Sequence, residues 1–291
     1  MFEGVHTALI TPFRDGRVDE AAFREIIERQ IEAGIDGFVP CGSTGESATL
    51  SHAEHRQVVE LVIEAVAGRV PVIAGTGSNS TREAIEFTAH AREAGAEGAL
   101  LLSPYYNKPT QEGIYAHYAT IAEETGLPLV LYNVPGRTAS NILPDTIARL
   151  ARLPGIVGIK EASGNLDQMA QIIAKSPPDF VVLSGDDSLT LPLLSIGGKG
   201  VISTTSNVAP AQVGDLVRSF LSGDVARARE RHYELLPLFG ALFCETNPIP
   251  VKAACAALGW CDAEIRLPLT RIDDANLEQL KVVMKDLGIL Q

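Results

Sequence analysis

The residue that most directly suggests chemistry is Lys160, which follows the short apolar run at 156–159. Such a run is typical of a strand buried on both faces of a parallel sheet. An inward-facing ammonium at its end would lose hydration, and desolvation favours the neutral amine that attacks a carbonyl. The alternative is a lysine that extends to solvent from the end of a strand. A nucleophilic Lys160 is the hypothesis that the other motifs support.

A glycine-rich segment with two hydroxyls, Gly42-Ser43-Thr44-Gly45-Glu46, follows another strand candidate. Glycines allow the backbone to fold back and expose consecutive N–H groups, which form a nest for an anion such as a carboxylate. The alternative is a turn that leads into a helix, since Gly and Ser are ordinary turn residues.

A third candidate group lies at Tyr132 and the following Asn133-Val134-Pro135-Gly136-Arg137. A tyrosine at the end of a strand can direct its phenol toward an amine on the next strand, or it can be a rim residue anchored by a hydrogen bond. Arg137 has the planar fork that suits a carboxylate, although most exposed arginines stay solvated.

The elements that must position these residues alternate along the chain. Short apolar runs predict strands at 5–10, 37–41, 70–74, 98–102, 127–132, 156–160, 180–184 and 200–203. Amphipathic segments lie between them, and Ser51-x-x-Glu54 and Ser80-x-x-Glu83 predict capping boxes at two helix starts. Eight strand–helix units predict an α/β fold, a (β/α)8 TIM barrel. The alternative, a doubly wound sheet, lacks its dinucleotide fingerprint, because Gly75-Thr76-Gly77 has no third glycine.

After residue 203 the strand pattern ends and helical patterning begins at about Pro210. We therefore expect a catalytic barrel over residues 1–225 and a C-terminal helical extension over residues 226–291.

In a barrel of this kind the active site lies at the carboxyl ends of the strands. Gly197-Gly198-Lys199-Gly200 precedes the last strand, lies on the opposite face and is interpreted as a tight turn. Gly185-Asp186-Asp187 follows the seventh strand, where many barrels bind phosphate, and its charge would repel a phosphate. The predicted substrate is a carboxylate.

Composition excludes several function classes. The net charge of −12 and the pI near 5.0 argue against nucleic acid or an anionic membrane as partner. The four cysteines form no CxxC pair, so neither a zinc site nor a disulfide framework is indicated. No signal segment and no apolar stretch long enough to span a bilayer is present, and we expect a cytoplasmic protein.

Seven strings carry a resemblance to a known family: GSTGE at 42–46, YYNKPTQEG at 105–113, YNVPGRT at 132–138, GIKEASGN at 158–165, LSGDD at 183–187, GVIS at 200–203 and NPIPVK at 247–252. In this order and spacing they resemble the bacterial dihydrodipicolinate synthases, of the group of pyruvate-dependent class I aldolases that includes N-acetylneuraminate lyase. The resemblance covers essentially the whole chain. GSTGE and Lys160 are common to the wider group, whereas the tyrosine pair at 105–106 and Arg137 are more specific to the synthases.

The resemblance implies condensation of pyruvate, held as a Schiff base, with L-aspartate 4-semialdehyde to give 4-hydroxy-tetrahydrodipicolinate in lysine and diaminopimelate biosynthesis. No metal or other cofactor is implied, because the iminium is the electron sink. The implied catalytic residues are Lys160 as nucleophile, Tyr132 as proton donor and acceptor, and Ser43 and Tyr106 as relay partners, with Tyr106 supplied by a neighbouring subunit. The implied substrate-binding residues are Thr44 for the carboxylate of pyruvate, Arg137 for that of the semialdehyde, and Gly185 and Ile202 in the pyruvate pocket.

Two alternatives remain open at this stage. Many synthases carry threonine at the position of Ser43, and serine there is familiar in N-acetylneuraminate lyases, so another pyruvate-dependent aldolase is one alternative. Such enzymes generally lack the equivalent of Arg137. The second alternative is a non-catalytic barrel that binds a keto acid, which would have no reason to retain Lys160, Tyr132 and the relay hydroxyls together.

The resemblance also implies a homotetramer, a dimer of dimers, and inhibition by L-lysine. The implied lysine site consists of Ser47, Ala48, His52, His55, Asn79, Glu83 and Tyr105. Three of these residues also have an ordinary interpretation: Glu83 belongs to a predicted capping box, and His52 and His55 lie in the first turn of a helix, where exposed polar residues are normal.

Overall fold

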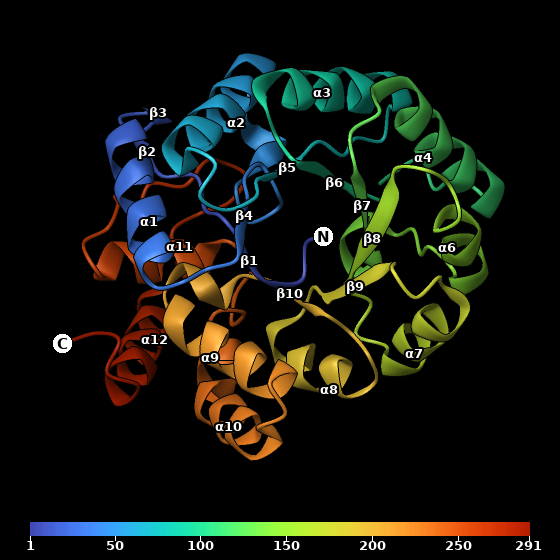
Figure 1. The fold of residues 1–291 in the computed structure, drawn as a ribbon. Coiled ribbons are helices and arrows are strands. Elements are labelled where there is room, and N and C mark those ends of the chain that lie inside the picture. Colours follow the sequence, from blue (N-terminus) through green and yellow to red (C-terminus); the bar gives the residue numbers. More distant parts are fainter.

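A computed structural model describes all residues, 1–291, and its centre is a barrel of eight parallel strands (Figure 1). The barrel strands are β1 (Gly4–Ala8), β4 (Gly37–Val39), β5 (Ile73–Gly75), β6 (Gly98–Leu102), β7 (Leu129–Asn133), β8 (Ile156–Glu161), β9 (Val181–Ser184) and β10 (Gly200–Ser203). The hydrogen-bonded order is β4-β1-β10-β9-β8-β7-β6-β5. A parallel bridge between Phe38 and Val72 joins the two ends, so the predicted TIM barrel is confirmed.

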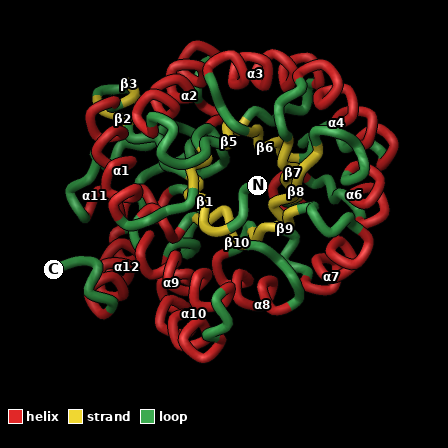
Figure 2. Tube along the Cα trace, viewed as in Figure 1, coloured by secondary structure: helices red, strands yellow, loops and turns green.

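A ring of helices surrounds the strands, as the tube in Figure 2 shows. The helices of the ring are α1 (Glu20–Glu32), α2 (His52–Val66), α3 (Thr81–Ala94), α4 (Gln111–Thr125), α5 (Pro135–Thr138), α6 (Pro144–Leu150), α7 (Leu166–Lys175), α8 (Thr190–Ser195) and α9 (Pro210–Leu221). α1 shows why such segments are helical: Asp19 caps its start, and Phe23, Ile26 and Ile27 recur on its buried face.

Two clusters of buried apolar side chains explain how the barrel holds together. The larger one lies between the strands and the helices. The smaller one consists almost wholly of strand residues that face the barrel interior: Phe2, Ala8, Val39, Ile73, Leu100, Val130, Tyr132, Val134, Val181, Leu183 and Ile202. A barrel filled in this way is a packed core and not a pore, so ligands bind at its carboxyl-terminal end.

The C-terminal extension is helical, as predicted, and it packs along one side of the barrel (Figure 1). It contains α10 (Val225–Ala241), α11 (Ile249–Ala257) and α12 (Asp274–Asp286). α10 begins at Val225, and the division of the chain at residues 225 and 226 stays a prediction. No helix combines the length and the apolar character needed to cross a bilayer.

The predicted strands agree with the structure to within a few residues, and 98–102 and 200–203 agree fully. One element was not predicted, an antiparallel hairpin of β2 (Phe13–Arg14) and β3 (Arg17–Val18). Its turn contains Asp15 and Gly16, both at positive φ, and Asp-Gly between two strands is a strong hairpin signal.

Candidate active site

Lys160 and Tyr132 lie on neighbouring strands at the carboxyl-terminal end of the barrel. They are Cα partners in the pairing of β7 with β8. Lys160 is 6% exposed, and its Nζ lies 4.5 Å from the centre of the Tyr132 ring. The amine therefore faces an aromatic ring instead of solvent, and the alternative of an extended lysine is wrong.

Gly185, directly after β9, leaves the space that the Lys160 side chain occupies. A Cβ built on Gly185 would lie 3.1 Å from Lys160 Cε and 2.5 Å from the Cβ of Ala162. A larger residue would therefore push against the candidate nucleophile. Ile202, in β10, is fully buried in the inner cluster that also contains Tyr132.

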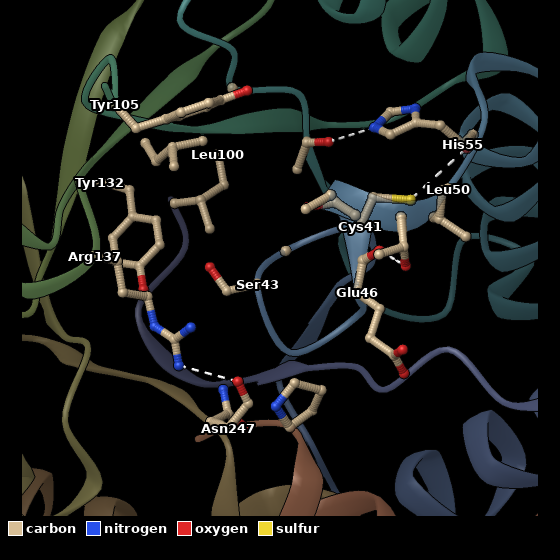
Figure 3. A pocket seen from close by; sticks show the side chains of 18 of the residues that line it. Cys41, Ser43, Glu46, Leu50, His55, Leu100, Tyr105, Tyr132, Arg137 and Asn247 are labelled. Carbon is tan, nitrogen blue, oxygen red and sulfur yellow. Dashed lines mark hydrogen bonds between the residues drawn. The ribbon is translucent and has the colours of Figure 1, made fainter. Parts of the chain in front are cut away.

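The segment after β4 brings two hydroxyl residues to the same end of the barrel. Thr44 is buried, and its Oγ1 accepts a hydrogen bond of 2.9 Å from Asn247 Nδ2 and lies 3.5 Å from Thr204 Oγ1. Ser43 extends toward the wall that holds Tyr132 and Arg137 (Figure 3). The loop therefore places both hydroxyl residues at the end of the barrel that also holds Lys160.

Arg137 lies in the one-turn helix α5, which follows β7. Its Nη2 donates to the main-chain oxygen of Asn247 at 3.1 Å, the contact drawn in Figure 3. Arg137 and Asn247 both line the large cavity at this end of the barrel. The remaining guanidinium donors are free of other protein partners, an arrangement that suits a carboxylate.

The cavity has a volume of about 510 Å³ and is lined by 24 residues. One end is formed by Ser43, Tyr132, Arg137 and Asn247. The other end contains six of the seven residues predicted for lysine: Ser47, Ala48, His52, His55, Glu83 and Tyr105. The seventh, Asn79, does not line it, and its main-chain oxygen accepts a bond of 2.9 Å from Asn107. The cavity thus connects Ser43, Tyr132 and Arg137 of the predicted catalytic and substrate-binding sites to the predicted lysine site, whereas Lys160, Thr44, Gly185 and Ile202 do not line it.

His55 and His52 differ in their surroundings. The expectation of an exposed residue is wrong for His55, which is buried, contacts the carbonyl of Gly75 through Nε2 at 2.8 Å and stacks on Phe87 at 4.1 Å. Burial lowers the pKa of His55. His52 is exposed, and its Nε2 lies 3.0 Å from Glu83 Oε1.

The predicted capping boxes also differ from each other. The box of Ser51 and Glu54 is complete. At the start of α3, the Ser80 hydroxyl accepts from the Glu83 amide, but the Glu83 carboxylate does not return to the Ser80 amide. It instead contacts the Ser78 hydroxyl and His52. The prediction of a second full capping box is wrong, and the Glu83 carboxylate faces the cavity.

Tyr106 is the one predicted relay residue that the single chain does not bring to the others. Its side chain is 88% exposed, it has a positive φ of 71°, and it does not line the cavity. Tyr105, by contrast, lines the cavity. An aromatic side chain so exposed in an isolated chain has no partner within that chain.

Two carboxyl groups follow β9 near the amine. Burial raises the pKa of Asp186, and the charge of Lys160 opposes that rise. Asp187 is a structural residue: it accepts from the Ser203 hydroxyl and from the amides of Thr204 and Thr205. Asp186 thus places a carboxyl group within electrostatic reach of the amine.

No group of three or more His, Cys, Asp or Glu side chains that could hold a metal ion is present. The polar groups of the cavity are hydroxyls, one side-chain amide, one thiol, two histidines, one guanidinium and the carboxylates of Glu46 and Glu83. Such groups bind acids and transfer protons.

Known proteins resemble this chain along its full length. The model of the Dihydrodipicolinate synthetase family matches residues 1–287. The 4-hydroxy-tetrahydrodipicolinate synthase of Nitratidesulfovibrio vulgaris strain DP4 is 58% identical over 290 residues, which cover 99% of each chain.

The chain belongs to the dihydrodipicolinate synthetase family.

Solved structures of the family agree with this fold. The dihydrodipicolinate synthase of Aquifex aeolicus has a TM-score of 0.98 and 50% identity, with 99% of each chain covered. The synthase of Cyanidioschyzon merolae, solved with lysine bound, has a TM-score of 0.97 and 45% identity, also with 99% of each chain covered.

The predicted enzyme class and reaction are thereby confirmed. The protein is a lyase of the dihydrodipicolinate synthetase family that condenses pyruvate with aspartate semialdehyde in lysine biosynthesis. A sialic-acid lyase or a non-catalytic barrel is not favoured.

Two residues near the cavity have no role predicted from the sequence. Asn247 belongs to the NPIPVK string, and it contacts both Thr44 and Arg137. Lys252, from the same string, forms an ion pair with Glu46 in which both side chains are 1% exposed. The available signal was a lysine within an otherwise apolar helix, since α11 reads IPVKAACAA.

Proposed function

We propose that Lys160 forms a Schiff base with pyruvate and that Tyr132 transfers the protons. The observation that carries the proposal is the position of Lys160, buried at the end of β8 with Nζ 4.5 Å from the ring of Tyr132. In the first step Nζ bonds to C2 of pyruvate, the carbonyl oxygen takes up a proton, and that oxygen then leaves as water. The product is an iminium, which needs no metal to stabilise the next carbanion.

The iminium loses a proton from C3 to become an enamine, and C3 then bonds to the aldehyde carbon of the semialdehyde. In that step the aldehyde oxygen takes up a proton to become a hydroxyl, and the iminium at C2 forms again. The α-amino group of the semialdehyde attacks C2, which closes the ring and releases Lys160. A phenol alone is a weak base near neutral pH, so these transfers require a chain of hydroxyls. We assign Ser43 and Tyr106 to that chain, with Tyr132 nearest the amine.

Carboxylate binding is divided between two residues. We assign the carboxylate of pyruvate to Thr44 and the adjacent amides, and that of the semialdehyde to Arg137. Gly185 and Ile202 shape the pyruvate pocket. The support is that Gly185 borders Lys160 Cε and that Arg137 lies at the cavity wall.

The relay requires a second subunit. Tyr106 is exposed and lies outside the cavity of its own chain, so we propose that it enters the active site of a neighbouring copy, within a homotetramer built as a dimer of dimers. Burial of an aromatic residue that is otherwise exposed favours such an interface. Analytical ultracentrifugation of Tyr106→Ala tests whether this residue supports the assembly.

The far end of the cavity is proposed to bind L-lysine and to inhibit the enzyme. Its Glu83 carboxylate suits an α-ammonium, and its histidines and Tyr105 suit the remaining polar atoms. The family structure solved with lysine bound is consistent with this proposal. We also expect the protein to work in the cytoplasm, which is where lysine biosynthesis takes place in bacteria.

One assay tests the proposed function. The purified protein is incubated with pyruvate plus either aspartate semialdehyde or N-acetylmannosamine. Turnover of pyruvate with the semialdehyde and not with N-acetylmannosamine supports the proposed function. Turnover with N-acetylmannosamine and not with the semialdehyde would show the activity of an N-acetylneuraminate lyase instead.

A further inference from the structure

Asn247 joins the two residues assigned to carboxylate binding. Its Nδ2 donates to Thr44 Oγ1 at 2.9 Å, and its main-chain oxygen accepts from Arg137 Nη2 at 3.1 Å. Thr44 follows β4 and Arg137 follows β7, whereas Asn247 lies just before α11 in the C-terminal extension. Figure 3 shows it at the foot of the cavity, below Arg137. One residue of the extension therefore contacts both binding groups.

The direction of the Thr44 bond decides what its hydroxyl can do. A hydroxyl has one proton to donate and two lone pairs that accept. Because Asn247 donates to Thr44, that contact uses a lone pair and leaves the proton of Thr44 for another acceptor. Within the protein that acceptor is Thr204 Oγ1, which lies at the long distance of 3.5 Å. A carboxylate would accept the same proton in a shorter, charge-assisted bond.

The other end of the Asn247 amide has no partner. Its Oδ1 is buried and unbonded, although the residue is 6% exposed and lines the cavity. Buried polar atoms are nearly always hydrogen-bonded, so an unbonded one at a cavity wall marks a position that a polar ligand or its water completes. The amide thus faces the ligand on one side while it holds Thr44 on the other.

We propose that Asn247 is a positioning residue for pyruvate binding, which acts by directing the hydroxyl proton of Thr44 toward the carboxylate of pyruvate. Its main-chain carbonyl holds Arg137 separately, for the second substrate. The proposal rests on the role assigned to Thr44 above, and it makes the C-terminal extension a part of the active site.

A purely structural role is the competing explanation, in which Asn247 only ties the extension to the barrel. Other contacts already make that connection: the buried Glu46–Lys252 pair, and Arg266, which donates its amide to Glu46 and pairs with Glu54. A structural link would affect stability, and it would not act on one substrate through one hydroxyl.

The experiment begins with Asn247→Ala, which removes the amide and keeps the carbonyl that holds Arg137. The loss of one hydrogen bond should raise the KM for pyruvate by about threefold to tenfold. The KM for the semialdehyde should change by less than about twofold, the usual limit for an uncoupled site. Asn276→Ala is the control, because it removes one side-chain bond of 2.8 Å, to Glu245, within the same extension and away from the cavity. Its KM for pyruvate should match that of the unmodified enzyme.

A double-mutant cycle then tests the path through Thr44. In a Thr44→Val background there is no hydroxyl to direct, so Asn247→Ala should change the KM for pyruvate by less than about twofold. An equal effect in both backgrounds would show that Asn247 does not act through Thr44 and would overturn the proposal.

Asn247→Asp provides an isosteric test if the alanine variant fails to fold. A carboxylate at this position cannot donate, so the Thr44 proton would turn toward it, and the KM for pyruvate should rise at least as far as in the alanine variant. An unchanged KM would mean that Thr44 donates to Asn247 in the native enzyme, which contradicts the proposal.

Borohydride trapping of pyruvate distinguishes failure of the proposed function from failure of the role assigned to Asn247. If the unmodified enzyme is not trapped at Lys160, the proposed function itself is wrong. If it is trapped and turns over normally while the Asn247 variants keep the native KM for pyruvate, only the role of Asn247 is wrong.

Discussion

Tyr132 and Lys160 are paired in register across β7 and β8, and the Lys160 amine lies over the face of the Tyr132 ring. The next pair in the same register is Asn133 with Glu161, where Asn133 Nδ2 donates to Glu161 Oε2 at 2.9 Å. Because successive strand residues face opposite sides, Tyr132 and Lys160 face into the barrel while Asn133 and Glu161 are bonded behind them. The outer pair fixes the register that brings the amine to the ring.

Lys160 is predicted to be the residue that forms an imine with pyruvate, since it is a buried lysine without an ion-pair partner whose amine faces Tyr132, a residue of the cavity wall. Borohydride reduction with pyruvate present should attach one reduced pyruvyl group to Lys160 and abolish activity, as peptide mass spectrometry would detect. Lys175→Ala, at an exposed lysine paired with Asp145, should be trapped normally. Labelling at another lysine, or no labelling, would contradict the assignment.

Tyr132→Phe is predicted to lower kcat by about 10²–10⁴-fold, the usual contribution of a positioned acid–base group. The variant keeps the ring that faces the amine and loses only the hydroxyl. Pyruvate should still be trapped at Lys160, but more slowly. Tyr233→Phe, at an exposed tyrosine of α10, serves as control. A near-native kcat for Tyr132→Phe would assign the proton transfers to another group.

The barrel was predictable because its strands are short apolar runs buried on both faces. The strand at 127–132 was nonetheless placed too early, since β7 ends at Asn133. A polar strand residue interrupts an apolar pattern, and only the bond to Glu161 shows why Asn133 belongs to the strand. The same holds for Glu161 at the end of β8.

The contacts of the C-terminal extension could not be predicted in the same way. Asn247 and Thr44 are separated by 203 positions, and Lys252 and Glu46 by 206. No local pattern relates such positions, because their proximity depends on where the extension docks on the barrel. Tyr106 differs from these residues. The family resemblance predicts a role for it, but in a single chain its side chain is exposed and lies outside the cavity.

Arg137→Ala is predicted to lower the catalytic efficiency with the second substrate, aspartate semialdehyde. A charge-assisted contact contributes about 1.5–3 kcal/mol, so kcat/KM for the semialdehyde should fall tenfold or more by that estimate. Imine formation with pyruvate should persist. Arg152→Ala, an exposed arginine outside the cavity, should behave as the unmodified enzyme. Loss of pyruvate trapping with retained semialdehyde affinity would show that the role is wrong.

The Glu46–Lys252 pair is predicted to matter for stability. Lys252→Met would leave the buried Glu46 carboxylate with the Arg266 amide as donor but without an opposite charge. This should lower the free energy of unfolding by about 3–5 kcal/mol. The double variant Glu46→Gln, Lys252→Met removes both charges and should recover much of that loss. Urea denaturation at fixed protein concentration measures both effects.

The control for this pair is Lys281→Met, which breaks the exposed pair of Lys281 with Glu278 and should cost less than about 1 kcal/mol. If Lys252→Met unfolds at the same urea concentration as Lys281→Met, the buried pair contributes no more than a surface one.

Inhibition by L-lysine is the last prediction, and it depends on the far end of the shared cavity. The Glu83 carboxylate is not used to cap α3, and it faces His52 and Ser78 at the cavity. We expect millimolar L-lysine to inhibit turnover partially, because Tyr105 at this end precedes the relay residue Tyr106. A ligand that holds Tyr105 can displace its neighbour without entering the active site. Such coupling requires two sites and different contacts in the free and bound states.

Glu83→Ala should remove the inhibition and leave uninhibited turnover nearly unchanged. Glu86→Ala is the matched control, because Glu86 is an exposed glutamate on the same helix that does not line the cavity. It should be inhibited like the unmodified enzyme. Titration of activity with L-lysine measures all three proteins. If the unmodified enzyme is not inhibited, Glu83 and His52 only contact each other at the cavity wall, and the cavity serves the substrates alone.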